Sequence, residues 1–511
     1  MKKQLHQNTA PSLRAAWLRL AAACLVLAAG GCAVGPNYRR PQTAVPASFK
    51  EADGWKPATP NDAADRGPWW ELFQDPILNQ LEGEAIVSNQ SLREAVANYE
   101  EARQLARADH ATLFPSLSAT GSYQRVRRSS GSASSTTASG ATAPTAGGSS
   151  DITTTAQAGL QAGWAPDFWG RIRRLSEADI AAAQASAADL ANARLSIQAV
   201  LAQDYILLRV ADERQRLYAH AVGDYQRTLE ISQNKYKAGI AARSDVISAQ
   251  AQLDSVRAQQ IDAGVQRAQL EHAIAVLLGH PPAEFSLAPQ PALVLPAPAI
   301  PAQLPSALLE RRPDIAAAER AVAEANARVG VQIAGYFPDI TLSGEAGYQS
   351  STLDRLFRTA NRTWSLGANL SETIFDFGQR RAEVLQARAA YDATVAAYRQ
   401  TVLSAFQGVE DDLSTLRLLG EEAAVQSAAV TEAADAARIA LNEYNAGIVD
   451  YTTVVTAQVA ELNARQSALT TLQTQRTTSV ALLEALGGGW TAADLPSSAA
   501  VLARNPPNRL P

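Results

Sequence analysis

The feature that most constrains this chain is an internal duplication. The segment Asn234–Ile240 (NKYKAGI) recurs as Asn442–Ile448 (NEYNAGI), at an offset of 208 residues (442 minus 234). Further pairs at the same offset are Ala249-Gln250 with Ala457-Gln458, Leu278-Gly279 with Leu486-Gly487, and Trp169-Gly170 with Phe377-Gly378. Ordered matches over roughly 200 residues are the signature of a repeated structural unit. The length of 511 residues alone would suggest about three domains, but the duplication predicts one body made of two similar halves.

A second offset locates an insertion in the first half. Upstream of the first set of matches, Phe114-Pro115 recurs as Phe337-Pro338, at an offset of 223 residues (337 minus 114). The 15 additional residues (223 minus 208) coincide with Ser129–Ser150, a tract of Ser, Thr, Gly and Ala without an apolar pattern. Such a tract predicts a flexible loop. A Pro-rich connector, Pro289–Pro305, joins the two halves.

Each half contains two segments in which apolar residues alternate with small polar residues. The period of two predicts strands at about 115–127, 152–166, 338–350 and 363–375. A half-buried sheet of a soluble protein would show the same alternation. The length of about ten residues, the aromatic residues at the segment ends and an export signal favour strands of an outer-membrane protein instead.

Long helices follow the strands in both halves. Arg171–Asn234 and Gln379–Glu443 contain no Pro, and their apolar residues recur with spacings of three and four. Sustained seams of this kind predict coiled-coil packing. Each long helix reaches a Gly, Gly239 or Gly447, and a second helix then returns. We expect both glycines to adopt the left-handed conformation that ends a helix.

The first residues form an export signal. A basic start is followed by the apolar run Leu20–Ala29, which is too short to span a membrane, and then by Ala29-Gly30-Gly31-Cys32. Small residues before a Cys resemble a bacterial lipoprotein signal, which implies cleavage after residue 31 and N-palmitoyl and S-diacylglycerol groups on Cys32. Ordinary secretion with a free Cys32 is the alternative.

Four strands are too few to close a membrane barrel, which needs about eight. An open sheet edge in lipid would leave backbone groups unpaired, at a cost of several kcal/mol each. The chain is therefore expected to oligomerise. A dimer would pool eight strands into a barrel filled by side chains, whereas a trimer would pool twelve around a lumen.

Three motifs resemble those of the outer membrane factors, the trimeric exit ducts of tripartite efflux pumps and related exporters. They are Trp69-Trp70-Glu-Leu-Phe73 with Asp75-Pro76, then Arg312-Pro313-Asp314, and the two Tyr-x-x-Gly turns. The resemblance implies a membrane α+β fold, in which a homotrimer forms a twelve-stranded outer-membrane β-barrel continued by a long periplasmic α-helical barrel. The implied segments are a signal (1–31), an N-terminal lipidated equatorial tail (32–75), a first repeat (76–288), a connector (289–313), a second repeat (314–489) and a C-terminal equatorial tail (490–511).

The resemblance also implies the partners and the function. It implies export of drugs or other small toxic compounds across the periplasm and outer membrane, from a chain anchored in outer-membrane lipid. The implied partners are a periplasmic membrane-fusion adaptor and an inner-membrane transporter of the resistance-nodulation-division type. A duct for type I protein secretion and a structural periplasmic coiled-coil lipoprotein are the alternatives that the sequence leaves open.

In this family the two turns lie at the periplasmic tip, where the adaptor docks and the duct closes. The implied tip residues are Tyr236, Gly239, Arg243, Ser244 and Asp245 in the first half, and Tyr444, Gly447, Asp450, Tyr451, Thr453 and Thr456 in the second. Some members carry Asp rings at the positions of Thr453 and Thr456, and this chain has no carboxylate there. Asp450, repeated by symmetry, either forms a ring at the gate or caps a helix.

Other function classes find little support. The 45 basic and 50 acidic residues give a formal net charge of −5, which argues against nucleic acid as a partner. Two Cys and five dispersed His suggest neither a disulfide scaffold nor a metal site. No nucleophile–base pair, paired carboxylates or Gly-rich phosphate loop stands out. We therefore expect neither an enzyme nor a bound cofactor.

Overall fold

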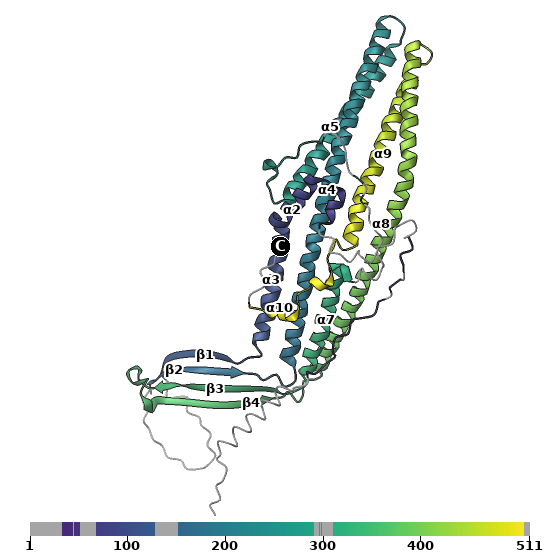
Figure 1. Ribbon diagram of the computed structural model, residues 1–511. Coiled ribbons are helices and arrows are strands. Elements are labelled where there is room, and N and C mark those ends of the chain that lie inside the picture. The colour runs from purple at the N-terminus through teal and green to yellow at the C-terminus, as the bar shows by residue number, and fades with distance from the viewer. Residues whose placement is uncertain are drawn as a thin grey trace, which may run out of the picture.

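The chain is elongated, with a sheet at one end and long helices that extend from it (Figure 1). The computed structural model describes residues 33–43, 45–46, 48–51, 68–127, 152–290, 296, 298 and 310–504. The signal segment, Cys32, the tract Ser129–Ser150 and most of the Pro-rich connector lie outside the described residues.

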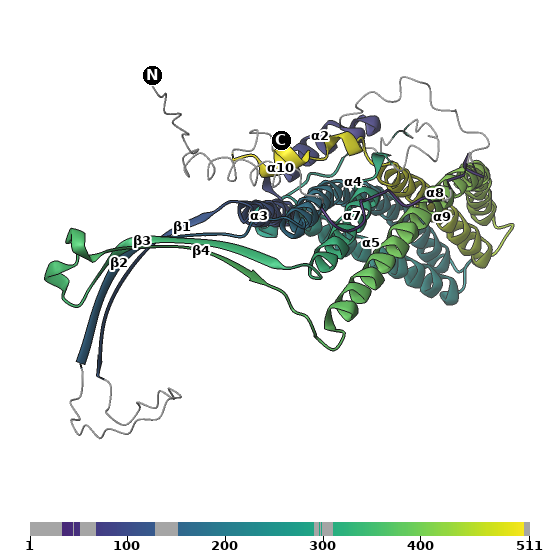
Figure 2. The ribbon, with the colours of Figure 1, turned by 90° about the horizontal axis from the view of Figure 1, so that it is seen from below.

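The sheet has four antiparallel strands in the order β1-β2-β3-β4. The strands are β1 (Ser116–Arg127), β2 (Ile152–Trp164), β3 (Asp339–Ser350) and β4 (Arg362–Ser371). Seen from below, they form a curved ribbon with β1 and β4 at its two edges (Figure 2).

The strand ends differ from the predicted bounds for local reasons. β1 and β3 each begin one residue after a Pro, and β2 ends two residues before Pro166; Pro has no N–H to donate to a ladder. β4 ends at Ser371, not at residue 375. The reason is that Arg380 holds the side chains of Glu372 and Asp376 at 2.8 and 2.6 Å, which turns the chain toward α8.

Two helical hairpins dominate the rest of the molecule. The first joins α4 (Arg171–Lys237) to α5 (Arg243–Leu277), and the second joins α8 (Gln379–Ala446) to α9 (Tyr451–Ala485). At 1.5 Å per residue, the 67 residues of α4 span about 100 Å. The shorter helices are α2 (Pro76–Ser88), α3 (Gln90–Ala111), α7 (Pro313–Ala334) and α10 (Ser498–Leu502).

The main core lies along apolar positions of α4 and α8. Leu201, Tyr205 and Leu208 of α4 and Tyr398 and Val402 of α8 are buried in one cluster. Burial of each such side chain stabilises the fold by roughly 1.5–3 kcal/mol. These buried residues follow the spacings of three and four that the sequence predicts for both helices.

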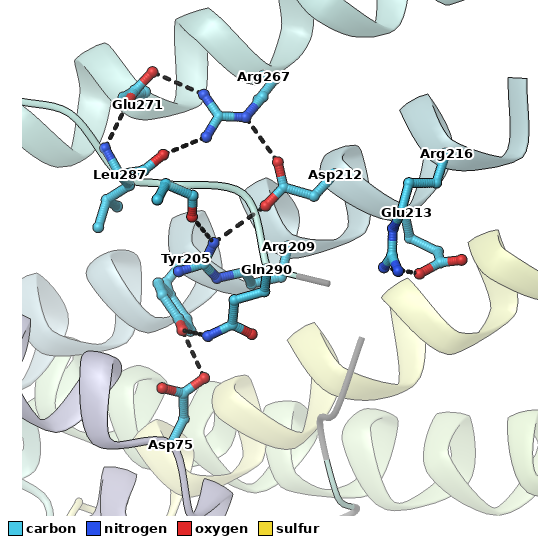
Figure 3. Close-up of polar contacts among 11 residues, drawn as sticks. Asp75, Tyr205, Arg209, Asp212, Glu213, Arg216, Arg267, Glu271, Leu287 and Gln290 are labelled. Carbon is cyan, nitrogen blue, oxygen red and sulfur yellow. Dashed lines mark hydrogen bonds and ion pairs between the residues drawn. The ribbon is translucent and has the colours of Figure 1, made fainter. Parts of the chain in front are cut away.

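Polar contacts around α4 fasten the segments that lead into each repeat (Figure 3). Asp75 caps α2 by accepting a hydrogen bond from the backbone N–H of Ile77 at 2.8 Å. Its other carboxylate oxygen accepts a hydrogen bond from the hydroxyl of Tyr205 at 2.6 Å. Because both partners are buried, this contact fixes the start of α2 on the middle of α4.

A second part of the same network ties the start of the connector to the first hairpin. Asp212 of α4 accepts hydrogen bonds from Arg209 at 3.1 Å and from Arg267 of α5 at 2.7 Å. Arg267 also contacts Glu271, which accepts a hydrogen bond from the backbone N–H of Leu287 (Figure 3). The side chains of Arg209 and Asp212 are almost fully buried, so each charge depends on its partners.

The described parts of the two tails lie against the helices rather than extending from them. The backbone N–H of Val34 donates to the carbonyl oxygen of Trp169 at 3.1 Å, and the backbone N–H of Lys50 donates to Glu410 of α8 at 2.7 Å. At the other end, Arg103 of α3 donates to the carbonyl oxygen of Ala503 at 2.7 Å. Among the helices of the described residues, none combines the length and the apolar character needed to cross a membrane.

Candidate functional site: the paired helical tips

The end of the molecule farthest from the sheet consists of two short turns, one in each hairpin (Figure 1). Gly239 has a φ of +73° and Gly447 a φ of +76°, the left-handed conformation that the sequence predicts. The backbone N–H of Ile240 donates to the carbonyl oxygen of Lys235 at 2.9 Å, and that of Ile448 donates to the carbonyl oxygen of Glu443 at 2.9 Å. These bonds satisfy carbonyls at the helix ends, as a left-handed cap does.

One cation joins the two hairpins beneath the turns. The Lys235 ammonium of α4 lies 3.8 Å from the ring centroid of Tyr444 of α8. It also donates a hydrogen bond to the carbonyl oxygen of Tyr444. The hydroxyls of Ser232 and Tyr444 lie 3.5 Å apart, at the limit of a hydrogen bond. The contact therefore links two helices that are 209 residues apart in sequence.

An aromatic pair continues this link toward α9. The rings of Tyr444 and Tyr451 meet edge to face with centroids 5.7 Å apart, and both side chains are buried. Burial raises the pKa of the Tyr451 hydroxyl to about 12, with smaller contributions from Tyr444, Tyr225 and Asp245. Tyr451 is therefore a neutral packing residue at physiological pH.

Asp450 is the N-cap of α9. Its carboxylate accepts hydrogen bonds from the backbone N–H of Thr453 at 3.0 Å and from the hydroxyl of Thr453 at 2.9 Å. These bonds hold the pKa of Asp450 below its ordinary value. The hydroxyl of Thr456 donates within α9, to the carbonyl oxygen of Thr452 at 2.9 Å. Of the two roles considered for Asp450, a ring at the gate and a helix cap, the geometry supports the helix cap.

The first hairpin lacks this cap. The position equivalent to Asp450 is Ala242 (450 minus 208), and no side chain caps the start of α5 there. Arg243 is the first residue of α5, and Asp245 lies in its first turn, where a carboxylate interacts favourably with the helix dipole. The hydroxyl of Ser244 donates to Asp245 at 3.4 Å. The two tips thus have the same backbone conformation at their turns but carry different charged residues.

An exposed apolar side chain follows the left-handed Gly in each turn. Ile240 is 74% exposed and the equivalent Ile448 is 73% exposed. Tyr236, one turn earlier on α4, is also exposed. Each tip therefore presents a large exposed apolar side chain at an equivalent position of the repeat.

The structure thus brings the predicted tip residues of both halves to one end of the molecule. Sequence reasoning missed Lys235, whose counterpart at the 208-residue offset is Glu443. That inversion of charge within the repeated motif was the available signal. Sequence reasoning also did not single out Ile240 and Ile448 as site residues, although both lie in the repeated motif.

A cleft of about 370 Å³ separates the hairpins below the tips. Its lining includes three ion pairs, each within one helix: Asp224–Arg227, Asp435–Arg438 and Glu461–Arg465. Ion pairs of this kind stabilise their own helices by a few tenths of a kcal/mol. These ion pairs do not join one hairpin to the other. The contact of Lys235 with Tyr444 is therefore prominent among the polar contacts between the hairpins near the tips.

The family model and the similar proteins all indicate outer membrane efflux proteins. Residues 81–280 and 304–488 match the model of the family described as "Outer membrane efflux protein". A probable efflux pump outer membrane protein, TtgC of Pseudomonas putida, is 31% identical over 481 residues, covering 93% of this chain and 95% of the relative. The pyoverdine export outer membrane protein OpmQ of Pseudomonas aeruginosa is 30% identical over 475 residues, covering 93% and 97%.

Solved structures give the same result for the fold. The outer-membrane channel OprN superposes with a TM-score of 0.81 at 30% identity, covering 90% of this chain and all of that chain. The open state of the MtrE outer membrane channel of Neisseria gonorrhoeae superposes with a TM-score of 0.77 at 28% identity, covering 90% and 99%. The chain therefore has the α+β fold of these outer-membrane channels.

Proposed function

This chain belongs to the outer membrane efflux protein family, and from that premise we propose that it is the exit duct of a tripartite efflux pump. The observation that carries the proposal is the combination of one membrane-compatible sheet with two hairpins about 100 Å long that end in paired tips. The sheet belongs in the outer membrane, and the helices extend into the periplasm toward the rest of the pump.

The assembly is a homotrimer in which three sheets form a twelve-stranded barrel. A periplasmic adaptor docks on the tips, where Ile240 and Ile448 offer an apolar surface. The inner-membrane partner is a transporter of the resistance-nodulation-division type. Cys32 carries N-palmitoyl and S-diacylglycerol groups that anchor the chain in outer-membrane lipid, and replacement of Cys32 by Ser should abolish palmitate labelling.

Small molecules are the proposed cargo. The curated relatives are named for efflux of toluene, solvents and antibiotics and for pyoverdine export. These names favour small compounds over the secreted proteins of a type I system. They also describe transport proteins rather than enzymes.

Planar-bilayer recording of the purified protein, combined with deletion of its gene, tests the proposal. We expect a small, gated single-channel conductance, and lower inhibitory concentrations of several drugs in the deletion strain. A protein that gives no defined conductance would overturn the proposal in favour of a structural lipoprotein. Loss of a secreted protein with unchanged drug susceptibility would overturn it in favour of protein secretion.

A further inference from the structure

We infer that the rim of the sheet farthest from the helices binds the phosphate groups of the anionic glycolipid that forms the outer leaflet of a Gram-negative outer membrane. This distal rim comprises the end of β1, the start of β4 and the loop between β3 and β4 (Figure 1). Its arginines are Arg125, Arg127, Arg355, Arg358 and Arg362. The inference rests on the proposed function, because it requires the sheet to lie in the outer membrane with this rim outward.

One face of the sheet is apolar and exposed. Side chains of a strand alternate between the two faces. The ladder register places Leu160, Ala346 and Trp364 opposite one another in three neighbouring strands, on the same face as Leu117 and Leu366. Trp364 is 73% exposed and Leu366 is 81% exposed. An apolar face this exposed is suited to contact with the acyl chains of lipids.

The two edge strands carry arginines on this same face. In β1, Arg125 follows Tyr123 by two residues, and in β4, Arg362 precedes Trp364 by two residues. Each Arg therefore lies on the lipid-facing side of its strand, about 7 Å farther from the helices than the aromatic ring. Tyr and Trp rings of membrane proteins lie at the level of the lipid headgroups. The arginines are thus placed at the level of the headgroup phosphates.

The loop between β3 and β4 adds two more arginines beside this face. The ring of Phe357 meets Tyr348 of β3 edge to face, with centroids 5.5 Å apart. The Asn361 side chain donates a hydrogen bond to the carbonyl oxygen of Arg355 at 2.6 Å, and its backbone N–H donates to the carbonyl oxygen of Arg358 at 2.9 Å. Since Tyr348 shares the apolar face of β3, these contacts hold the loop against the lipid-facing side.

The positive charge of the distal rim is not balanced within the chain. Among the described residues of this rim, Asp354 is the one carboxylate, and it lies 3.6 Å from the Arg355 guanidinium. Five arginines and one carboxylate leave a formal charge of +4 (five minus one). The side chains of all five arginines are exposed.

The opposite rim, where the sheet meets the helices, is balanced. Its arginines form the ion pairs Arg171–Asp339 at 3.7 Å, Arg173–Asp167 at 3.2 Å, and Arg380 with Glu372 at 2.8 Å and with Asp376 at 2.6 Å. The two rims of one sheet therefore differ in net charge. The imbalance at the distal rim points to an anionic partner outside the chain.

A phosphorylated glycolipid fits the distal rim in chemistry and in position. Its phosphates lie where the acyl chains meet water, which is the level that the aromatic rings assign to the arginines. A guanidinium binds a phosphate through two parallel hydrogen bonds, and basic clusters near anionic headgroups are attracted to them. The phospholipids of the inner leaflet would instead meet the opposite rim, whose arginines are already paired.

Native mass spectrometry of the assembled protein in detergent tests the inference. The protein is titrated with lipid A that carries both phosphates, with dephosphorylated lipid A, and with phosphatidylglycerol. The test variant combines Arg125→Gln with Arg362→Gln, and the conservative variant combines Arg125→Lys with Arg362→Lys. The control combines Arg257→Gln with Arg438→Gln, which removes the same charge from exposed positions of α5 and α8.

We expect the wild type to bind lipid A more tightly than dephosphorylated lipid A or phosphatidylglycerol. The affinity of the test variant for lipid A should fall about 30-fold, while its affinity for dephosphorylated lipid A should not change. The conservative variant should keep most of the affinity, and the helix control should match the wild type.

Three results would overturn the inference. They are equal affinities of the wild type for the two forms of lipid A, equal affinities for lipid A and phosphatidylglycerol, and an equal change in the test variant and the helix control. The comparison of the lipids uses the wild type alone, so it decides the question even if a variant fails to assemble.

The conductance of the same preparations separates this inference from the proposed function. A conducting channel that does not distinguish the two forms of lipid A overturns the phosphate site alone. A protein that binds lipid A through the distal rim but never conducts supports the site and overturns the function as an exit duct.

Discussion

The Lys235 ammonium lies 3.8 Å from the ring centroid of Tyr444 and donates a hydrogen bond to that residue's carbonyl oxygen. The two residues belong to α4 and α8, so this contact joins the first hairpin to the second at the end of the molecule farthest from the sheet. Below it, the lining of the cleft includes ion pairs that stay within single helices. Lys235 is therefore placed to hold the two tips together.

Replacement of Lys235 by Gln should loosen the tips. The variant loses a cation–π contact of about 1 kcal/mol together with a charged hydrogen bond. We expect a higher single-channel conductance and greater susceptibility to bulky antibiotics. Lys237→Gln, two residues away on an exposed position, removes the same charge and should leave both unchanged. Equal effects from the two variants would point to overall tip charge instead.

Substitutions of Asp450 can distinguish a helix-capping role from a role of its charge in the gate. Replacement of Asp450 by Asn keeps a side-chain oxygen for the backbone N–H of Thr453 but removes the charge. We expect Asp450→Asn to conduct as the wild type does, and Asp450→Ala to fray the start of α9, seen as faster amide exchange there. Since hydrogen bonds lower the pKa of Asp450, the stability that its ionised form adds is lost only below about pH 4. A conductance change in Asp450→Asn equal to that in Asp450→Ala would assign the role to the charge.

The sequence predicts the elements because their causes are local. The alternation of apolar residues, the Pro positions and the apolar spacings of three and four place the strands and long helices. Gly239 and Gly447 have the left-handed backbone that a turn between helices requires. The contact of Lys235 with Tyr444 has no such local cause. It depends on how closely two separate hairpins approach, and no periodicity encodes that distance.

The sequence also does not predict the contacts of charged side chains in the first helical hairpin. The pattern predicts α4 to within three residues of its end. The network of Arg209, Asp212 and Arg267 instead depends on which faces of α4 and α5 meet the connector. Asp450 is an intermediate case. Its capping position can be read from the sequence, and only the structure shows that Thr453 occupies its carboxylate.

Glu82 of α2 should make stability depend on pH. It is 0% exposed, and neither carboxylate oxygen has a hydrogen-bond partner among the described residues. Burial raises its pKa to about 9, so the folded chain keeps a proton that the unfolded chain releases above about pH 4.5. Stability is therefore highest below that pH and falls as the pH rises toward 9. By pH 7 the loss is about 3 kcal/mol.

Replacement of Glu82 by Gln should remove this dependence. We expect the midpoint temperature of unfolding to match the wild type near pH 4.5 and to exceed it increasingly up to pH 9. The control is Glu101→Gln, which removes an exposed carboxylate of α3 and should follow the wild-type curve. Parallel curves for Glu82→Gln and the wild type would mean that Glu82 is ionised in the folded chain.

Phe377 should stabilise the assembly rather than the single chain. Its ring is 92% exposed and contacts Phe375, with centroids 4.4 Å apart. Replacement by Ala should therefore leave the fold of one copy intact. We expect this exposed ring to pack on a neighbouring copy, where an aromatic contact is worth about 1 kcal/mol beyond the buried area. The Phe377→Ala trimer should therefore dissociate in detergent at a lower temperature.

The control is Phe377→Trp, which keeps a large aromatic ring at the same position. Position 377 corresponds to Trp169 in the first half of the chain (377 minus 208). We therefore expect the Phe377→Trp trimer to dissociate at the wild-type temperature. Heated-gel mobility and circular dichroism measure dissociation and unfolding separately. If Phe377→Ala lowers the unfolding temperature of the monomer and leaves dissociation unchanged, then Phe377 packs within its own chain.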